Sequence, residues 1–317
     1  MGDQAEKLRE IMRQRKGVQT GRPGGVSGRD PRLPAGPAGQ MRRAVIGDRQ
    51  EGKTRIIAVT SAKGGVGKTN LSVNMALAFA RLGKKVVVMD ADLGLANVNV
   101  MFNMIPKYNL YHVIKKQKSI REILVETEYG ISIVAGASGF SQIANLEEDD
   151  RLYFINELDT LSFADIIIID TAAGVSSNVL DFVTAADDVI IVTTPEPTAI
   201  TDAYALIKII ATEYDTMNIG LKLVVNRARG SAEAKNVSDR ITCIAGQFLY
   251  IKVDYLGFIY DDPAVPGAVR SQKPFMVMDP KSKASQCVQH LVERMDKSKP
   301  KESGGIGSMF KKIFNRS

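Results

Sequence analysis

The chain has 317 residues, of which 44% are hydrophobic, and a formal net charge of +7, so it can bury the core of one domain of about 240 residues with two tails. Residues 1–55 carry a net charge of +7 and residues 296–317 carry +4, which leaves −4 on the segment between them and argues against a DNA-binding core. Two cysteines without a C-x-x-C pair exclude the usual ligands of an iron–sulfur cluster, and the absence of a signal peptide or of an apolar run of 18 residues predicts a cytoplasmic protein.

The first 54 residues divide into two stretches of different composition. Residues 1–16 predict a short helix, whereas residues 17–54 are rich in glycine, proline and arginine and predict a flexible linker. We therefore expect one body over residues 55–296 and a second tail over residues 297–317.

A glycine-rich loop follows the first strand of the body. Residues 56–60 predict a buried strand and residues 70–82 predict a helix, which gives the loop the strand–loop–helix context of a phosphate-binding P-loop. Lys68 would reach the β and γ phosphates, and the Thr69 hydroxyl would ligate Mg²⁺. The predicted nucleotide-binding residues are Gly64, Gly65, Val66, Gly67, Lys68, Thr69 and Asn70.

The same loop carries a second lysine, Lys63, at a position that ordinary P-loops leave open. Lys63 lies too early in the loop to repeat the role of Lys68, so we expect it to act differently. The alternative is a glycine-rich turn with two solvated lysines, and the flanking strand and helix argue against it.

Two later segments deliver carboxylates at the ends of apolar strands. Asp90 and Asp92 end the first of these strands, and Asp170 ends the second. Ligands bind at such strand ends in open α/β sheets. One carboxylate there can hold Mg²⁺ through water while another orients an attacking water. The alternative is that these residues only end strands, but their order after a P-loop favours a phosphoryl-transfer site.

Strands and helices alternate through the rest of the body. This alternation predicts right-handed crossovers and an α/β fold, a doubly wound, mostly parallel sheet with helices on both faces. The expected strands are residues 86–90, 131–135, 166–170, 189–193, 221–226 and 255–260, and the expected helices include 151–160, 198–214 and 232–250.

Residues 55–295 resemble the deviant-Walker-A ATPases of the MinD/ParA family. The strings that carry the resemblance are residues 63–69, 90–97 and 170–174. The resemblance implies a P-loop ATPase that binds ATP and Mg²⁺. It also implies an ATP-dependent homodimer in which Lys63 crosses to the phosphates of the partner.

The resemblance further implies roles for single residues. Asp92 would activate the attacking water. Asn226 and Arg227, at a strand end, resemble the family's adenine contact, although they also fit a strand leaving into a turn, and residues 259–263 resemble the second base-side segment. The residues implied for the Mg²⁺ shell are Thr69, Asp92 and Asp170.

The C-terminal residues predict a short amphipathic helix, with Lys311, Lys312 and Arg316 flanking one apolar face. Such a helix is typical of a surface-lying membrane anchor, as in MinD-like relatives; the alternative is a terminal helix packed on the body. One short helix binds lipids weakly, so pairing two in an ATP-bound dimer would bring the protein to the inner face of the cell membrane. The predicted apolar face consists of Ile306, Met309, Phe310, Ile313 and Phe314.

Residues 3–9, with the sequence DQAEKLR, resemble the N-terminal activator motif of the FlhG family of flagellar number and placement ATPases. The resemblance implies two partners: the signal-recognition-type GTPase FlhF, which the motif stimulates in that family, and flagellar switch (C-ring) proteins. Asn99 stands where FlhG relatives carry an aspartate. This chain therefore lacks that carboxylate, and no role is assigned to position 99. The motif residues expected at the FlhF contact are Asp3, Gln4, Ala5, Leu8 and Arg9.

Two other functions fit parts of the sequence. A ParA-like DNA partition ATPase would bind duplex with a steep salt dependence, and the acidic body argues against nucleic acid as a partner. A MinD-like division-site regulator would share the membrane switch, but it would have no evident use for the N-terminal motif. The sequence therefore favours an FlhG-type ATPase.

Overall fold

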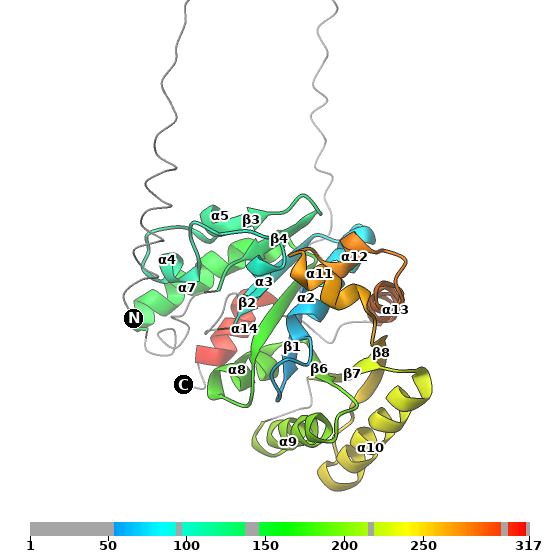
Figure 1. The fold of residues 1–317 in the computed structure, drawn as a ribbon. Coiled ribbons are helices and arrows are strands. Elements are labelled where there is room, and N and C mark those ends of the chain that lie inside the picture. Colours follow the sequence, from blue (N-terminus) through cyan, green and yellow to red (C-terminus); the bar gives the residue numbers. More distant parts are fainter. Residues whose placement is uncertain (1–53, 93–96, 137–145, 215–218, 299–303, 315–317) are drawn as a thin grey trace, which may run out of the picture. The chain divides into compact units, whose positions relative to one another are not determined.

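The computed structural model describes residues 54–92, 97–136, 146–214, 219–298 and 304–314. Its strands are β1 (Arg55–Ser61), β2 (Val86–Ala91), β3 (Leu124–Glu126), β4 (Ile131–Val134), β5 (Ile166–Ala173), β6 (Asp188–Thr193), β7 (Gly220–Ala228) and β8 (Asp254–Tyr260). They form one sheet in the order β3-β4-β2-β5-β1-β6-β7-β8 (Figure 1). Every neighbouring pair is parallel except β3 with β4. The predicted doubly wound, mostly parallel sheet is confirmed.

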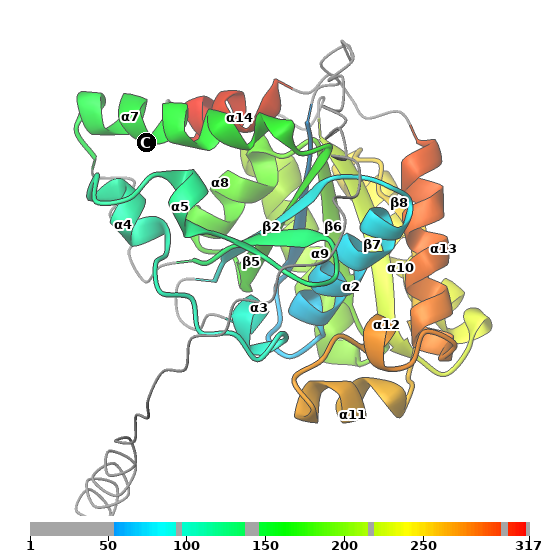
Figure 2. The ribbon, with the colours of Figure 1, turned by 90° about the horizontal axis from the view of Figure 1, so that it is seen from above.

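Helices cover both faces of this sheet (Figures 1 and 2). Along β1, Ile56 and Ala58 point into one apolar core, whereas Ile57 and Val59 point into the other, because neighbouring side chains of a strand face opposite ways. The helices are α2 (Lys68–Arg81), α3 (Asn97–Val100), α4 (Leu110–Ile114), α5 (Ile120–Ile123), α7 (Glu148–Asp159), α8 (Ser177–Ala185), α9 (Pro197–Glu213), α10 (Ser231–Leu249), α11 (Ala264–Arg270), α12 (Phe275–Met278), α13 (Lys283–Lys297) and α14 (Gly305–Phe314), with a 3₁₀ turn η1 (Thr160–Phe163) after α7.

The strand register brings the predicted carboxylates together. β5 lies between β1 and β2, with Asp170 paired to Val59 on one side and to Asp90 on the other. Both carboxylates therefore lie at the carboxyl edge of the sheet, directly beside the loop that leaves β1.

The opposite edge of the sheet is tied to the end of α13. Arg55, the first residue of β1, donates to the carbonyl of Met295 (2.7 Å) and forms an ion pair with Asp188 (2.6 Å). Lys222 of β7 also pairs with Asp188 (2.6 Å). The end of α13 is thus fixed at the amino edge of the sheet, away from the carboxylates.

The C-terminal helix α14 is packed on the body, along α7 (Figure 2). The ring of Phe310 makes T-shaped contacts with Phe154 of α7 (5.6 Å) and Phe182 of α8 (5.9 Å). This conformation matches the alternative of a terminal helix packed on the body, because α7 and α8 cover the apolar face, and the membrane anchor stays a prediction. The covered side chains are Ile306, Met309, Phe310, Ile313 and Phe314.

The sequence pattern also missed several short elements. Edge strand β3 and helices α3 to α5 are three to five residues long, which is too short for hydrophobic periodicity to be visible. In the part of the chain that the structure describes, no helix combines the length and the apolar composition needed to span a membrane.

Candidate active site

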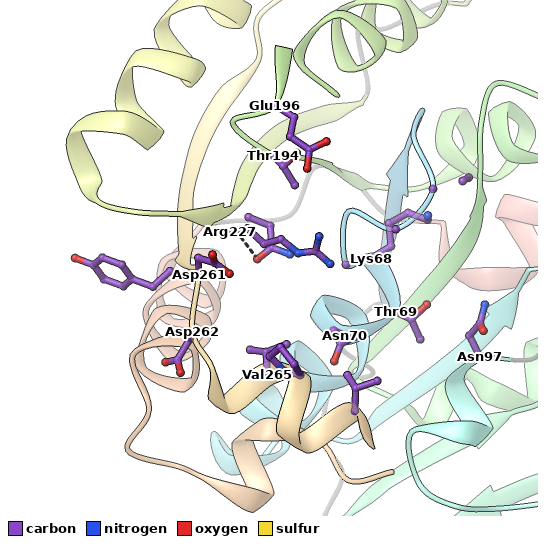
Figure 3. A pocket seen from close by; sticks show the side chains of 18 of the residues that line it. Lys68, Thr69, Asn70, Asn97, Thr194, Glu196, Arg227, Asp261, Asp262 and Val265 are labelled. Carbon is purple, nitrogen blue, oxygen red and sulfur yellow. Dashed lines mark hydrogen bonds between the residues drawn. The ribbon is translucent and has the colours of Figure 1, made fainter. Parts of the chain in front are cut away.

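A cavity of about 1220 Å³ opens where β2, β5, β6, β7 and β8 end. The loop between β1 and α2 forms one wall, and the turns after β7 and β8 form the opposite wall (Figure 3). Among its lining residues are Lys68, Thr69, Asn70, Asp92, Asn97, Thr194, Glu196, Arg227, Asp261, Asp262 and Val265.

The loop has the backbone geometry of a phosphate cradle. Gly65 and Gly67 adopt φ values of +75° and +97°, which side-chain-bearing residues disfavour. A Cβ at Gly67 would also overlap the side-chain amide of Asn226. Because α2 begins at Lys68, the first N–H groups of this helix lack partners within the helix and can receive an anion.

Lys68 lies between this loop and the carboxylates. Burial lowers its pKa, while Asp170 and Asp92 act in the opposite direction. The carboxylates of Asp170 and Asp92 lie near enough to stabilise the charged ammonium of Lys68, and an incoming phosphate would stabilise it in the same way.

Asp170 is a candidate Mg²⁺-shell residue. Burial raises its pKa to about 6, against the hydroxyls of Thr69 and Ser72, which lower it. Ser72 donates to Oδ1 (2.8 Å), whereas Oδ2 is buried and has no hydrogen-bond partner within the described residues. An oxygen in that position, beside the Thr69 hydroxyl, fits a hydrated Mg²⁺ ion, which prefers oxygen ligands and keeps several waters.

Asp90 holds the neighbouring segment in place. Its two carboxylate oxygens accept the backbone N–H groups of Asp92 (3.0 Å) and Val98 (3.1 Å). Asn97 then donates to Asp92 Oδ2 (3.2 Å). Burial, followed by the charge of Asp170, raises the pKa of Asp90 to about 7. These contacts orient the Asp92 carboxylate at the wall of the cavity.

Lys63 is held at the rim by its own chain. Its Nζ lies 2.7 Å from Oε2 of Glu196, in the turn that follows β6, and 2.9 Å from Oγ1 of Thr198, in the first turn of α9. The two side chains of the ion pair remain 34% and 57% exposed, so the pair is weak and easily exchanged. Sequence reasoning missed Glu196 and Thr198, although they follow a strand end as the carboxylates do.

At the end of the cavity where the adenine base is expected, Asn226 also contacts the P-loop. Its Nδ2 donates to the carbonyl of Val66 (2.7 Å), and its Oδ1 accepts the N–H of Arg227 (2.9 Å). Asn226 therefore braces the loop, while Arg227 lines the cavity. Asp262 is also occupied, since it accepts the N–H groups of Ala264 and Ala284 at the starts of α11 and α13.

The structure thus brings most of the predicted site residues together. Gly64, Gly65, Gly67, Lys68, Thr69, Asn70, Asp92, Asn226 and Arg227 line the cavity, whereas the Val66 side chain is buried in the core. Asp170 lies beneath the lining, against Ser72. Residues 3–9, the expected activator motif, lie outside the described residues.

We expect Asp170→Asn to stabilise the nucleotide-free protein at pH 7.5 by about 1–3 kcal/mol, because it removes a buried charge and retains the acceptor for Ser72. The folded pKa of about 6 exceeds the ordinary value of 3.8, so the charge destabilises the wild type above pH 6. This penalty is complete above pH 6, shrinks as the pH falls from 6 to 3.8 and disappears below 3.8. Thermal melts across pH 4–8 without Mg²⁺ measure it. An equal difference between the two proteins at pH 4.5 and 7.5 would contradict this account.

Comparisons with known proteins agree with this geometry. A family described as an AAA domain matches residues 54–223. The chain is 39% identical to the "Antiactivator FleN" of Pseudomonas aeruginosa over 243 residues, which cover 76% of this chain and 86% of the relative. It is 36% identical to the "Flagellum site-determining protein YlxH" of Helicobacter pylori over 275 residues, or 83% and 91%.

Among solved structures, the fold matches one chain of the "MinC:MinD cell division protein complex" of Aquifex aeolicus with a TM-score of 0.63 and 27% identity. The match covers 80% of this chain and 100% of that one.

Proposed function

The chain belongs to the FleN/YlxH group of AAA-domain ATPases of the MinD/ParA type, and we propose that it is an ATP-driven switch controlling the number and placement of flagella. The observation that carries the ATPase part is Lys68 lying beside Asp92 and Asp170 at one phosphate-binding loop. The names of the two relatives support the flagellar part.

In this proposal the residues divide the hydrolytic task. The loop N–H groups and Lys68 bind the β and γ phosphates. Asp92, oriented by Asp90 and Asn97, accepts a hydrogen bond from the attacking water and aligns it with the γ phosphate. Thr69 and Asp170 would hold Mg²⁺, which when bound neutralises charge on the phosphate oxygens.

The position of Lys63 supports the dimerisation that the resemblance to MinD/ParA ATPases implies. The lysine rests on Glu196 and Thr198 at the rim, where a second copy facing the cavity would offer it a triphosphate. Exchange of an exposed carboxylate for a polyanion is favourable, so ATP in the partner draws Lys63 across. The ATP-bound state is then a homodimer.

The docked α14 supplies a membrane-binding element that can be released. Burying each of its five apolar side chains contributes about 1.5–3 kcal/mol, whereas ordering each of its ten residues costs about 1–2 kcal/mol. The two totals are similar, so docking is reversible. We propose that two released helices in one dimer hold a cytoplasmic protein at the inner face of the membrane.

Phe310→Glu is expected to abolish ATP-dependent sedimentation with anionic phospholipid vesicles, because the charge would sit on the face that enters the bilayer. ATP binding should persist, since Phe310 packs on Phe154 and Phe182 rather than in the cavity. Ser308→Ala, on the half-buried side of α14, is the control and should sediment as the wild type does. Undiminished binding by the Phe310 variant would remove the membrane role.

We assign residues 1–16 to a separate activator segment, residues 17–54 to a linker, residues 55–296 to the ATPase domain and residues 297–317 to the membrane tail. The activator would act on the GTPase FlhF, while the body would engage flagellar switch proteins. This assignment rests on the DQAEKLR string, which distinguishes the proposal from MinD-like division-site regulation and from ParA-like partition.

A peptide of residues 1–20 should stimulate GTP hydrolysis by the cognate FlhF, and Gln4→Ala should lose this stimulation, because its amide can both donate to and accept from a hydrolytic site. Phosphate release measures both. In the full protein the Gln4 variant should still dimerise with ATP. If neither the peptide nor deletion of residues 1–20 alters GTP turnover, the flagellar assignment fails in favour of a MinD-like function.

A further inference from the structure

The start of α14 meets the end of α7 through one polar contact. The backbone N–H of Gly307, in the first turn of α14, donates to Asp159 Oδ1 (2.9 Å). Gly307 is buried, and a Cβ at this position would overlap the Asp159 carboxylate. The carboxylate therefore approaches the helix closely only because residue 307 is glycine.

The negative charge of Asp159 does not stabilise α7, the helix that carries it. It is the last residue of α7, where a negative charge opposes the helix dipole, and no basic residue occupies the last turn of α7. In contrast, α14 has no acidic residue in its own first turn. Asp159 thus supplies to α14 the anion that its N-terminus lacks.

Release of α14 from the body would affect its polar contact differently from its apolar contacts. A bilayer can replace the apolar surroundings of Phe310 and its neighbours, so those contacts exist in similar form in both states. The hydrogen bond from Gly307 to Asp159 exists only in the docked state. Only interactions that differ between two states shift their equilibrium.

We propose that Asp159 and Gly307 form a latch that holds α14 on the body and sets how readily the helix is released. The latch itself rests on the docked contact, and its consequence for lipid binding rests on the proposed membrane function. The latch is an autoinhibitory contact: by favouring the docked state, it lowers the affinity of the nucleotide-free protein for anionic lipid surfaces.

Hydrogen exchange of the α14 amides in the full-length, nucleotide-free protein tests the latch without lipids. Asp159→Ala removes the acceptor and Gly307→Ala adds the obstructing Cβ, so each should raise α14 exchange about fivefold, as expected for loss of a helix cap. In the double variant the Cβ no longer meets a carboxylate, so exchange should not exceed that of Asp159→Ala alone. Exchange of α13 should be unchanged in all three.

Asp149→Ala is the matched control, because it removes the same charge from α7 at the opposite end of the helix. Faster α14 exchange in the latch variants but not in the control supports the latch, and wild-type exchange in both single variants overturns it. Binding of the same variants to vesicles of anionic phospholipid, measured without ATP, then tests the membrane role separately. If exchange rises but vesicle binding does not, the latch stands and the membrane role fails.

Discussion

Replacing Lys68 with alanine is expected to reduce ATP hydrolysis by at least about a hundredfold and to abolish ATP-dependent dimerisation. Lys68 is buried beside Asp170 and Asp92, so no mobile surface lysine can take its place at the β and γ phosphates. Without it, the two carboxylates would repel the nucleotide. Phosphate release and light scattering with and without ATP measure the two effects.

The Lys68 variant needs a fold control, because Lys68 is buried and its truncation to alanine removes packed side-chain volume. Lys68→Met keeps the aliphatic volume and should show the same loss of hydrolysis. Lys84→Ala, which removes a surface lysine paired with Asp296 (3.0 Å), should retain turnover. Wild-type turnover by either folded Lys68 variant would remove the site assignment.

Asp92→Ala should stop hydrolysis while leaving ATP binding intact, so that the ATP-bound dimer accumulates. The loop N–H groups and Lys68 still bind the phosphates, whereas the group that aligns the water is gone. Light scattering at saturating ATP should report twice the monomer mass over a long incubation.

The second substitution Lys63→Ala in that background should return the protein to a monomer, because the contact across the interface is lost. An Asp92 variant that stays monomeric at saturating ATP contradicts the assigned role. A dimer that survives loss of Lys63 would instead place the interface elsewhere.

Much of the site follows from local sequence. Residues 63–69 carry their own glycines, and the strands ending at Asp90 and Asp170 are apolar runs whose exit points are visible in the sequence. Because parallel strands of one sheet end at the same edge, these segments had to converge once the fold was predicted. The same logic explains why the order of strands and helices could be predicted from alternation alone.

Contacts between distant segments could not be predicted in this way. The approach of Lys63 to Glu196 joins residues 133 positions apart, and that of Asn226 to Val66 spans 160. Asn226 looked like a free base contact, since nothing in its neighbourhood shows that a carbonyl from the P-loop would occupy its donor.

The face of α14 shows a different limit. An apolar stripe indicates that one face of a helix will be buried, but it does not show whether a lipid bilayer or a groove of the same protein buries it. Here the groove comes from Phe154 and Phe182, which lie more than a hundred residues earlier.

The attachment of α13 to β1 limits how the protein can stand on a surface. Only residues 299–303 separate the described end of α13 from Gly304, and a chain of that length reaches about 20 Å when fully extended. Arg55 fixes the end of α13 at the amino edge of the sheet. In the proposed membrane-bound state, a released α14 would therefore act as a short tether that turns this edge towards the lipid and keeps the nucleotide cavity on the side facing away from it.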